Sequence, residues 1–113
     1  MPDVGRIMST EFVIVFVTTS SIQQARAITQ VLLERKKAAC VNIAAGISSS
    51  FLWQNKIEQA EENLLIIKTK AVLLDDVIAL VKQHHEYEVP EIIALPVAGG
   101  SPEYLQWLDE SLR

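Results

Sequence analysis

The sequence predicts one α+β domain in which strands and helices follow in the order β-α-β-β-α-β, with a further helix at the end. The chain has 113 residues, a length that suits a single domain. Short runs rich in β-branched residues alternate with segments of helical periodicity, and no repeat or linker interrupts residues 9–113. We therefore expect residues 9–113 to form one domain and residues 1–8 to form a loosely ordered tail.

The first strand and the first helix are predicted over residues 12–37. Residues 12–18 form an unbroken run of mostly β-branched and aromatic side chains, which is typical of a strand buried on both faces. Ser21 followed by Gln24 matches a capping box, so a helix is expected to begin there and to continue to about Lys37. Its apolar positions keep helical spacing: Ile22, Ala25, Ile28, Leu32 and Leu33.

The middle of the chain predicts a long, bent hairpin. Residues 38–43 favour a second strand, which we expect to break at Gly46. An extended pattern resumes over residues 48–54, and Asn55 suits a turn before a third strand that returns to Lys70.

A second long helix is predicted from about residue 73 to residue 84 or 85. Asp75 and Asp76 lie in its first turn, where negative charge stabilises the positive end of the helix dipole. Pro90 ends this region, and residues 91–97 favour the fourth strand.

The last helix begins after Ser101, a suitable cap that is followed by a proline at the first helical position. The order of elements is therefore that of a ferredoxin-like sandwich with a C-terminal helix. In such a sandwich both long helices cover one face of the sheet. Three of the four strands are nevertheless apolar at nearly every position, so both faces need cover, and we predict a homo-oligomer.

Composition excludes several classes of function. Ten basic residues against 14 acidic ones give a net charge of −4, which argues against binding to nucleic acid. The apolar run over residues 12–17 is too short to span a membrane, and no basic targeting segment precedes it. Cys40 is the single cysteine and cannot form an internal disulfide, so we interpret it as a structural thiol and predict a cytoplasmic location.

The clearest candidate site lies in residues 84–91, where two imidazoles and three carboxylates occur within eight residues. Imidazole nitrogens suit Cu(II) and Zn(II), and carboxylates can complete the shell. We predict metal ligands at His84, His85 and Glu91. The alternative is that His84 continues the apolar stripe of its helix as a packed side chain, while His85 is solvated at the helix end.

Lys68 is a second candidate because it is a charge within an apolar strand. We expect the Lys68 ammonium group either to reach solvent or to form an ion pair with a carboxylate such as Glu91, Glu58 or Glu61. It could line a cleft between subunits that suits a small anion; otherwise it forms a structural ion pair at the subunit interface. The residues predicted for this cleft are Trp53, Lys68, Tyr87 and Glu88.

From Phe12 to Arg113 the sequence resembles the CutA family, which is named for divalent-cation tolerance. The matching segments are Ala38-Ala39-Cys40-Val41-Asn42-Ile43, Ser50-Phe51-Leu52-Trp53, Leu65-Ile66-Ile67-Lys68-Thr69, Tyr87-Glu88-Val89-Pro90-Glu91-Ile92 and Tyr104-Leu105-Gln106-Trp107-Leu108. The resemblance implies a homotrimer laid out like the PII signalling proteins, with strands of neighbouring subunits pairing. It also implies binding of copper or another divalent cation and no catalytic activity.

Some relatives with a copper site supply a cysteine at the end of the first strand, where this chain has Val17. Without the thiolate that selects Cu(I), we expect weak binding of copper or zinc through imidazole and carboxylate. The alternatives are a PII-like module that binds a small molecule or anion, and a structural trimeric scaffold for partner proteins. A hydrolase of the acylphosphatase type would need an arginine after the first strand, and residues 18–21 contain none.

Overall fold

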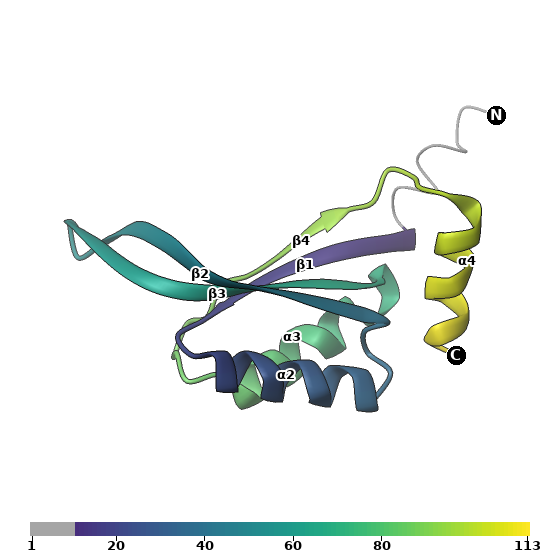
Figure 1. Cartoon of the computed structure of the whole chain (residues 1–113), viewed down its shortest axis with the longest axis horizontal. Helices are drawn as coiled ribbons and strands as arrows, with labels where there is room; N and C mark the ends of the chain where they lie inside the picture. The colour runs from purple at the N-terminus through teal and green to yellow at the C-terminus, as the bar shows by residue number, and fades with distance from the viewer. Residues whose placement is uncertain (1–10) are drawn as a thin grey trace.

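The computed structural model describes residues 11–113, and its core is a four-stranded antiparallel sheet in the order β2-β3-β1-β4 (Figure 1). The predicted ferredoxin-like α+β fold is confirmed. The predicted tail at residues 1–8 lies outside the described residues. The elements are β1 (Phe12–Thr19), α2 (Ile22–Glu34), β2 (Cys40–Trp53), β3 (Lys56–Lys70), the 3₁₀ turn η1 (Ala71–Leu73), α3 (Leu74–His84), β4 (Ile92–Pro96) and α4 (Pro102–Ser111).

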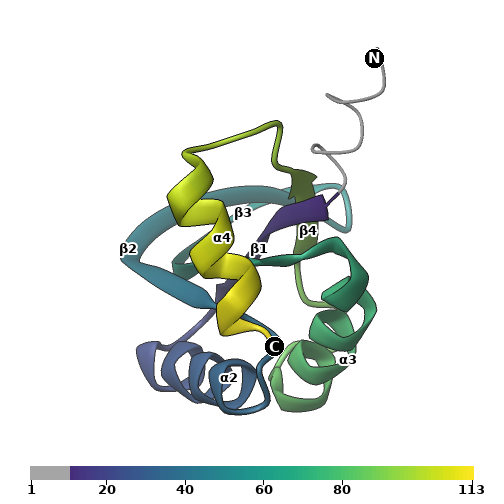
Figure 2. The ribbon, with the colours of Figure 1, turned by 90° about the vertical axis from the view of Figure 1, so that its right-hand side faces the viewer.

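Helices α2 and α3 lie side by side beneath one face of the sheet, and α4 stands across one end of it (Figure 2). Alternate residues of the central strands point toward α2 and α3. The side chains of Val15, Val17, Leu65 and Ile67 have no exposed surface there and form the centre of the hydrophobic core. This alternation follows from the two-residue period of a strand.

The start of α2 agrees with its predicted cap. The Ser21 hydroxyl accepts a hydrogen bond from the Gln24 amide at 3.1 Å. The Gln24 side chain does not return the bond: its Oε1 is buried and has no partner among the described residues. The helix also ends earlier than expected, at Glu34, because Lys36 adopts a left-handed conformation with φ of 55°.

The expected break at Gly46 is wrong. Strand β2 continues through it by means of a bulge between Ala44 and Ile47, and Gly46 takes a φ of 71°. Glycine adopts this conformation without the steric cost that a Cβ brings, so the bulge bends the strand without ending it.

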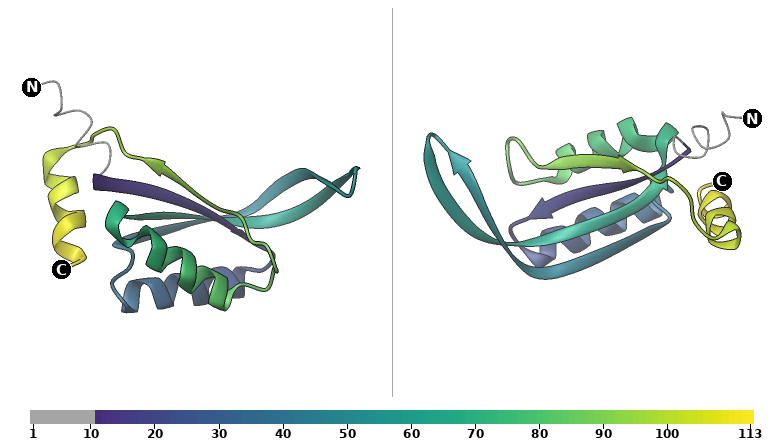
Figure 3. Two further views of the ribbon diagram at one scale, coloured as in Figure 1. Left: turned by 180° about the vertical axis from the view of Figure 1, so that it is seen from behind. Right: turned by 90° about the horizontal axis from the view of Figure 1, so that it is seen from above.

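The β2–β3 hairpin closes with a two-residue turn. Gln54 and Asn55 both have positive φ, 51° and 66°, which is the conformation of a type I′ turn. The hairpin extends well beyond the part of the sheet that the helices cover (Figure 3). The radius of gyration is accordingly 15.3 Å, against about 13 Å for a compact domain of this length.

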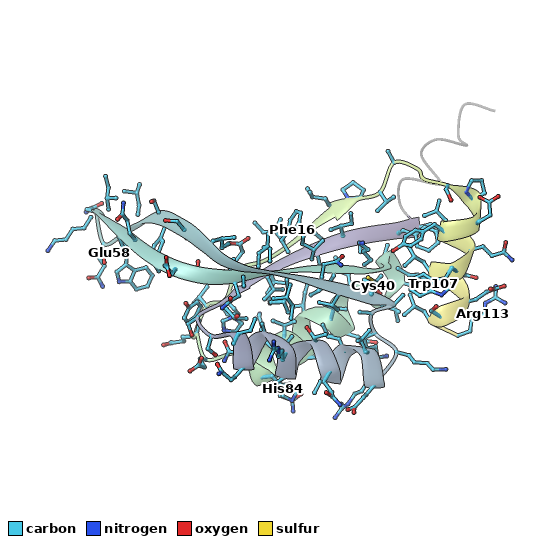
Figure 4. All side chains as sticks on the ribbon, in the orientation of Figure 1. Phe16, Cys40, Glu58, His84, Trp107 and Arg113 are labelled. Carbon is cyan, nitrogen blue, oxygen red and sulfur yellow. The ribbon has the colours of Figure 1, made fainter. Side chains whose placement is uncertain are left out.

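The sheet face away from α2 and α3 is apolar and poorly covered. Phe16 projects from this face, whereas His84 lies on the helical side (Figure 4). Ile93 and Leu95 of the edge strand β4 are 54% and 49% exposed. None of the helices within residues 11–113 is both long and apolar enough to cross a membrane.

Candidate functional site

His84 is the last residue of α3, and its side chain is exposed. Its Nδ1 lies 2.9 Å from the carbonyl oxygen of Leu80. A carbonyl can only accept, so Nδ1 carries the proton and the lone pair is left on Nε2. The expectation that His84 is packed with the apolar stripe does not hold, because the stripe ends with Val81.

His85 follows the helix in an extended conformation, with φ of −91° and ψ of 143°, and is half-buried. Its Nε2 lies 2.7 Å from the carbonyl oxygen of Thr18, and its Nδ1 lies 3.0 Å from the backbone nitrogen of Tyr87. The partners assign the roles: Nε2–H donates to Thr18, and Nδ1 accepts from Tyr87. Both ring nitrogens of His85 are therefore engaged, and His85 is not the solvated residue of the pair.

Tyr87 extends this arrangement to strand β3. Its ring centroid lies 4.8 Å from that of His85, and its hydroxyl donates to the Glu62 carboxylate at 3.1 Å. Burial, followed by the hydrogen bond to Glu62 and the charge of Glu62, raises the pKa of Tyr87 above its usual 10.0. We call Thr18, Glu62, His85 and Tyr87 the His85 cluster.

The carboxylates of the same segment face solvent. Glu86 accepts a hydrogen bond from the Ser20 hydroxyl at 3.0 Å, and Glu88 and Glu91 are exposed. Within residues 11–113, no three His, Cys, Asp or Glu side chains of one chain come together as a group that could hold a metal ion. A metal ion at residues 84–91 would therefore need ligands from water or from another subunit.

Two of the residues predicted for the anion cleft, Trp53 and Lys68, are far apart within one chain. Trp53 pairs with Lys56 at the hairpin turn, whereas Lys68 lies opposite Cys40. The 12 residue-to-residue steps along β3 from Lys56 to Lys68 span about 40 Å at roughly 3.3 Å per step. Trp53 and Lys68 could line one cleft only if they came from different subunits.

Lys68 has an aromatic neighbour that the sequence did not indicate. Its Nζ lies 5.9 Å from the centre of the Tyr104 ring on α4, which in turn packs against Trp107 at 5.5 Å between ring centroids. An ammonium group at this distance from an aromatic face is attracted to it. Tyr104 lies 36 residues away from Lys68, so only the docking of α4 brings the two together.

Glu62 and Thr18 are also functional candidates that sequence analysis did not single out. Glu62 is 9% exposed, and the Tyr87 hydroxyl that reaches it comes from 25 residues away. Thr18 takes part through its backbone carbonyl, which no residue type encodes. A glutamate at a position that becomes buried was the one available signal, and the neighbouring hairpin glutamates Glu58 and Glu61 hide it.

The topology and the two layers define a ferredoxin-like protein whose second sheet face is open. Residues 13–111 match the family of CutA1 divalent ion tolerance proteins. The CutA protein of Arabidopsis thaliana, named as chloroplastic, is 44% identical over 89% of this chain and 56% of its own length. The divalent-cation tolerance protein CutA of Thermus thermophilus is 43% identical over 87% of this chain and 95% of its own length.

A solved structure leads to the same family. The periplasmic divalent cation tolerance protein CutA of Archaeoglobus fulgidus has a TM-score of 0.87 and 40% identity, with 90% of this chain and 99% of that one covered. The chain belongs to the CutA1 divalent ion tolerance family. It spans little more than half of the plant relative but nearly all of the Thermus protein.

The predicted cytoplasmic location is contradicted. The Arabidopsis relative is named chloroplastic and the Archaeoglobus protein is described as periplasmic, and both point away from the cytoplasm. The prediction rested on a lone cysteine and on finding no targeting pattern in the sequence. A lone cysteine shows only that no internal disulfide is made, and a protein without disulfides can reside in any compartment.

Proposed function

We propose that this protein acts in divalent-cation tolerance as a non-enzymatic homotrimer that binds copper or zinc weakly at clefts between subunits. The ligands proposed from the chain are the His84 imidazole and the Glu91 carboxylate. His85 could join them only by giving up a bond to Thr18 or Tyr87. The observation that carries the proposal is membership of the divalent ion tolerance family over residues 13–111.

Two features of the chain support weak binding. The position where a thiolate would stand, Val17, is fully buried between the sheet and the helices. The exposed Nε2 lone pair of His84 is accessible, but no group of three ligands surrounds it within the described part of one chain. A single imidazole with carboxylates suits borderline ions and gives modest affinity.

The oligomer is proposed because the far face of the sheet is apolar. Ile93 and Leu95 would be shielded from water by a second sheet packed over them. The number of three subunits comes from the family resemblance. Light scattering after size exclusion should therefore give three times the mass of the chain, and a stable monomer at micromolar concentration would contradict the proposal.

Metal binding is tested by isothermal titration of chelator-treated protein with Cu(II) and with Zn(II). We expect a dissociation constant on the order of 100 μM, or about −5.5 kcal/mol. His84→Gln should abolish the binding heat, whereas the neighbouring exposed Gln83→Ala should leave it unchanged. Absence of any heat, or equal binding by His84→Gln, would overturn this part of the proposal.

A PII-like module for a small anion is the second candidate, and half-buried Lys68 against Tyr104 favours it. Thermal-shift measurements separate the two functions. A rise in Tm with Cu(II) or Zn(II) alone supports metal binding, because a ligand at 100 times its Kd adds about 2.7 kcal/mol. A rise only with nucleotides or polyphosphate supports the anion module, and no rise with either supports a scaffold.

A further inference from the structure

We infer that His85 is a positioning residue and not a metal ligand: its neutral imidazole ties the end of β1 to the segment that carries Glu86, Glu88 and Glu91. The inference rests on the proposed function and deepens it, since these carboxylates belong to the segment proposed to bind the metal ion. It differs from the sequence-based expectation, in which His85 was one of three ligands.

The first step is the backbone group that His85 satisfies. The pairing of β1 with β4 ends at Val17 opposite Ile92, so no β4 residue lies opposite Thr18. Thr18 is only 7% exposed, and its carbonyl oxygen accepts from His85 Nε2 at 2.7 Å. A buried carbonyl without a donor is costly, so His85 substitutes for the strand partner that is missing there.

The second step is the turn that His85 makes with its own segment. Its Nδ1 accepts from the amide of Tyr87, two residues ahead, in the manner of an aspartate or asparagine side chain in an Asx turn. This bond sets Tyr87 beside the imidazole, and the Tyr87 hydroxyl then reaches Glu62 on β3. The His85 cluster thus joins β1, the segment after α3, and β3.

The third step concerns metal binding. Imidazole binds a metal through the lone pair of an unprotonated nitrogen. In His85 that nitrogen is Nδ1, which already accepts the Tyr87 amide, whereas the corresponding nitrogen of His84 is Nε2 at an exposed side chain. A metal ion should therefore bind His84 and leave His85 in place.

The tautomers can be observed directly in the metal-free protein. The chain contains two histidines, so long-range ¹H–¹⁵N spectra of the imidazoles are assigned with a single His84→Gln variant. We expect the Nε2–H form for His85 and the Nδ1–H form for His84. An Nδ1–H tautomer, or rapid averaging of both forms, at His85 would overturn the inference.

Titration with Zn(II) alone then follows each ring. The signals of His84 should shift or broaden while those of His85 stay at their metal-free positions. A shift of His85 at the same Zn(II) concentration as His84 would contradict the inference. If neither ring responds, the metal part of the proposed function fails, and the tautomer in the metal-free protein still decides the role of His85.

Conservative variants separate the two bonds of His85. Gln places an amide nitrogen near the position of Nε2 and should keep the bond to Thr18. Asn places an oxygen near Nδ1 and should keep the bond to the Tyr87 amide, so that amide should exchange slowly in His85→Asn and at least tenfold faster in His85→Ala. Equal exchange in both variants would contradict the positioning role.

The same variants serve as the metal control. His85→Gln, checked for an otherwise unchanged amide spectrum, should bind Zn(II) within about twofold of the unmodified chain, whereas His84→Gln should lose binding. A tenfold or greater loss in folded His85→Gln would show that His85 is a ligand and would overturn the inference.

Discussion

Both faces of the sheet carry large apolar side chains, but the surroundings of the two faces differ greatly. On the face toward α2 and α3, Val15 and Ile67 are fully buried. On the opposite face their chain neighbours Phe16 and Ile66 are half-buried, and Leu95 is 49% exposed. The alternation of side chains along a strand predicts which residues share a face. Whether that face is buried depends on the other elements that pack on it.

Among the elements of residues 11–113, α4 approaches the far face, and it does so at one end. Lys70 of β3 forms an ion pair with Asp109 of α4, and Lys68 lies against Tyr104. The central part of the face, around Phe16, has no such cover from the described part of the chain. In the proposed oligomer a second copy would pack on the open face, so equivalent substitutions on the two faces should have different effects.

The largest effect is expected from Ile67→Ala on the covered face. The substitution removes a fully buried side chain and leaves a cavity, so the free energy of unfolding should fall by about 2–5 kcal/mol. Urea denaturation followed by circular dichroism measures it. A loss below about 1 kcal/mol would mean that the core around β3 can collapse into the space.

The matched substitution Ile66→Ala, one residue earlier on the opposite face, distinguishes an open face from a covered one. If a subunit covers Ile66, the loss should be about 1–2 kcal/mol and the Tm should depend on protein concentration. If the face stays in water, the loss should remain within about 0.5 kcal/mol, as for most surface substitutions. Unfolding at two protein concentrations tests this, and a small, concentration-independent loss would contradict the oligomer.

The smallest effect is expected at the end of the far face, where α4 is attached. Hydrogen bonds from Lys70 and Arg113 lower the pKa of Asp109 below its usual 3.8. Because the pKa is lower in the folded state, these bonds stabilise the protein above pH 3.8, and the stabilisation is lost as the pH falls through the folded pKa.

The variant Asp109→Asn should accordingly lower the Tm by only a few degrees at pH 7 and should remove this part of the acid sensitivity. Melting curves between pH 3 and pH 7 for both proteins measure the difference. Parallel curves for the two proteins over that range would show that the Asp109 ion pairs do not hold α4.

Much of the fold could be predicted because its signals are local. The caps at Ser21 and Ser101 form with the amides of Gln24 and Tyr104, three residues on, as a sequence pattern can show. The class of fold followed from the number of elements and their order along the chain. The exact ends of the elements could not be predicted. Gly46 lies in a bulge within β2, and Lys36 lies outside α2. Both outcomes depend on the rest of the fold, which sets the pairing of a strand and the conformation of a left-handed residue.

The sequence predicted where the two histidines lie in the fold but not what surrounds them. Helical spacing correctly located His84 and His85 at the end of α3. The alternative interpretation gave the more buried position to His84. The structure instead leaves His84 exposed and half-buries His85, because the helix stops and the chain turns the His85 ring toward Thr18, 67 residues earlier. No short-range pattern records such a contact.

The sequence by itself determined the class of fold, the helix starts, the apolar surplus of the strands and the resemblance to the CutA family, because each depends on neighbouring residues or on their order. Only the tertiary structure decided which sheet face is covered, which proton His85 carries and what Lys68 and Tyr87 touch. Those features depend on groups that lie 25 to 67 residues apart in the chain and meet only after it has folded.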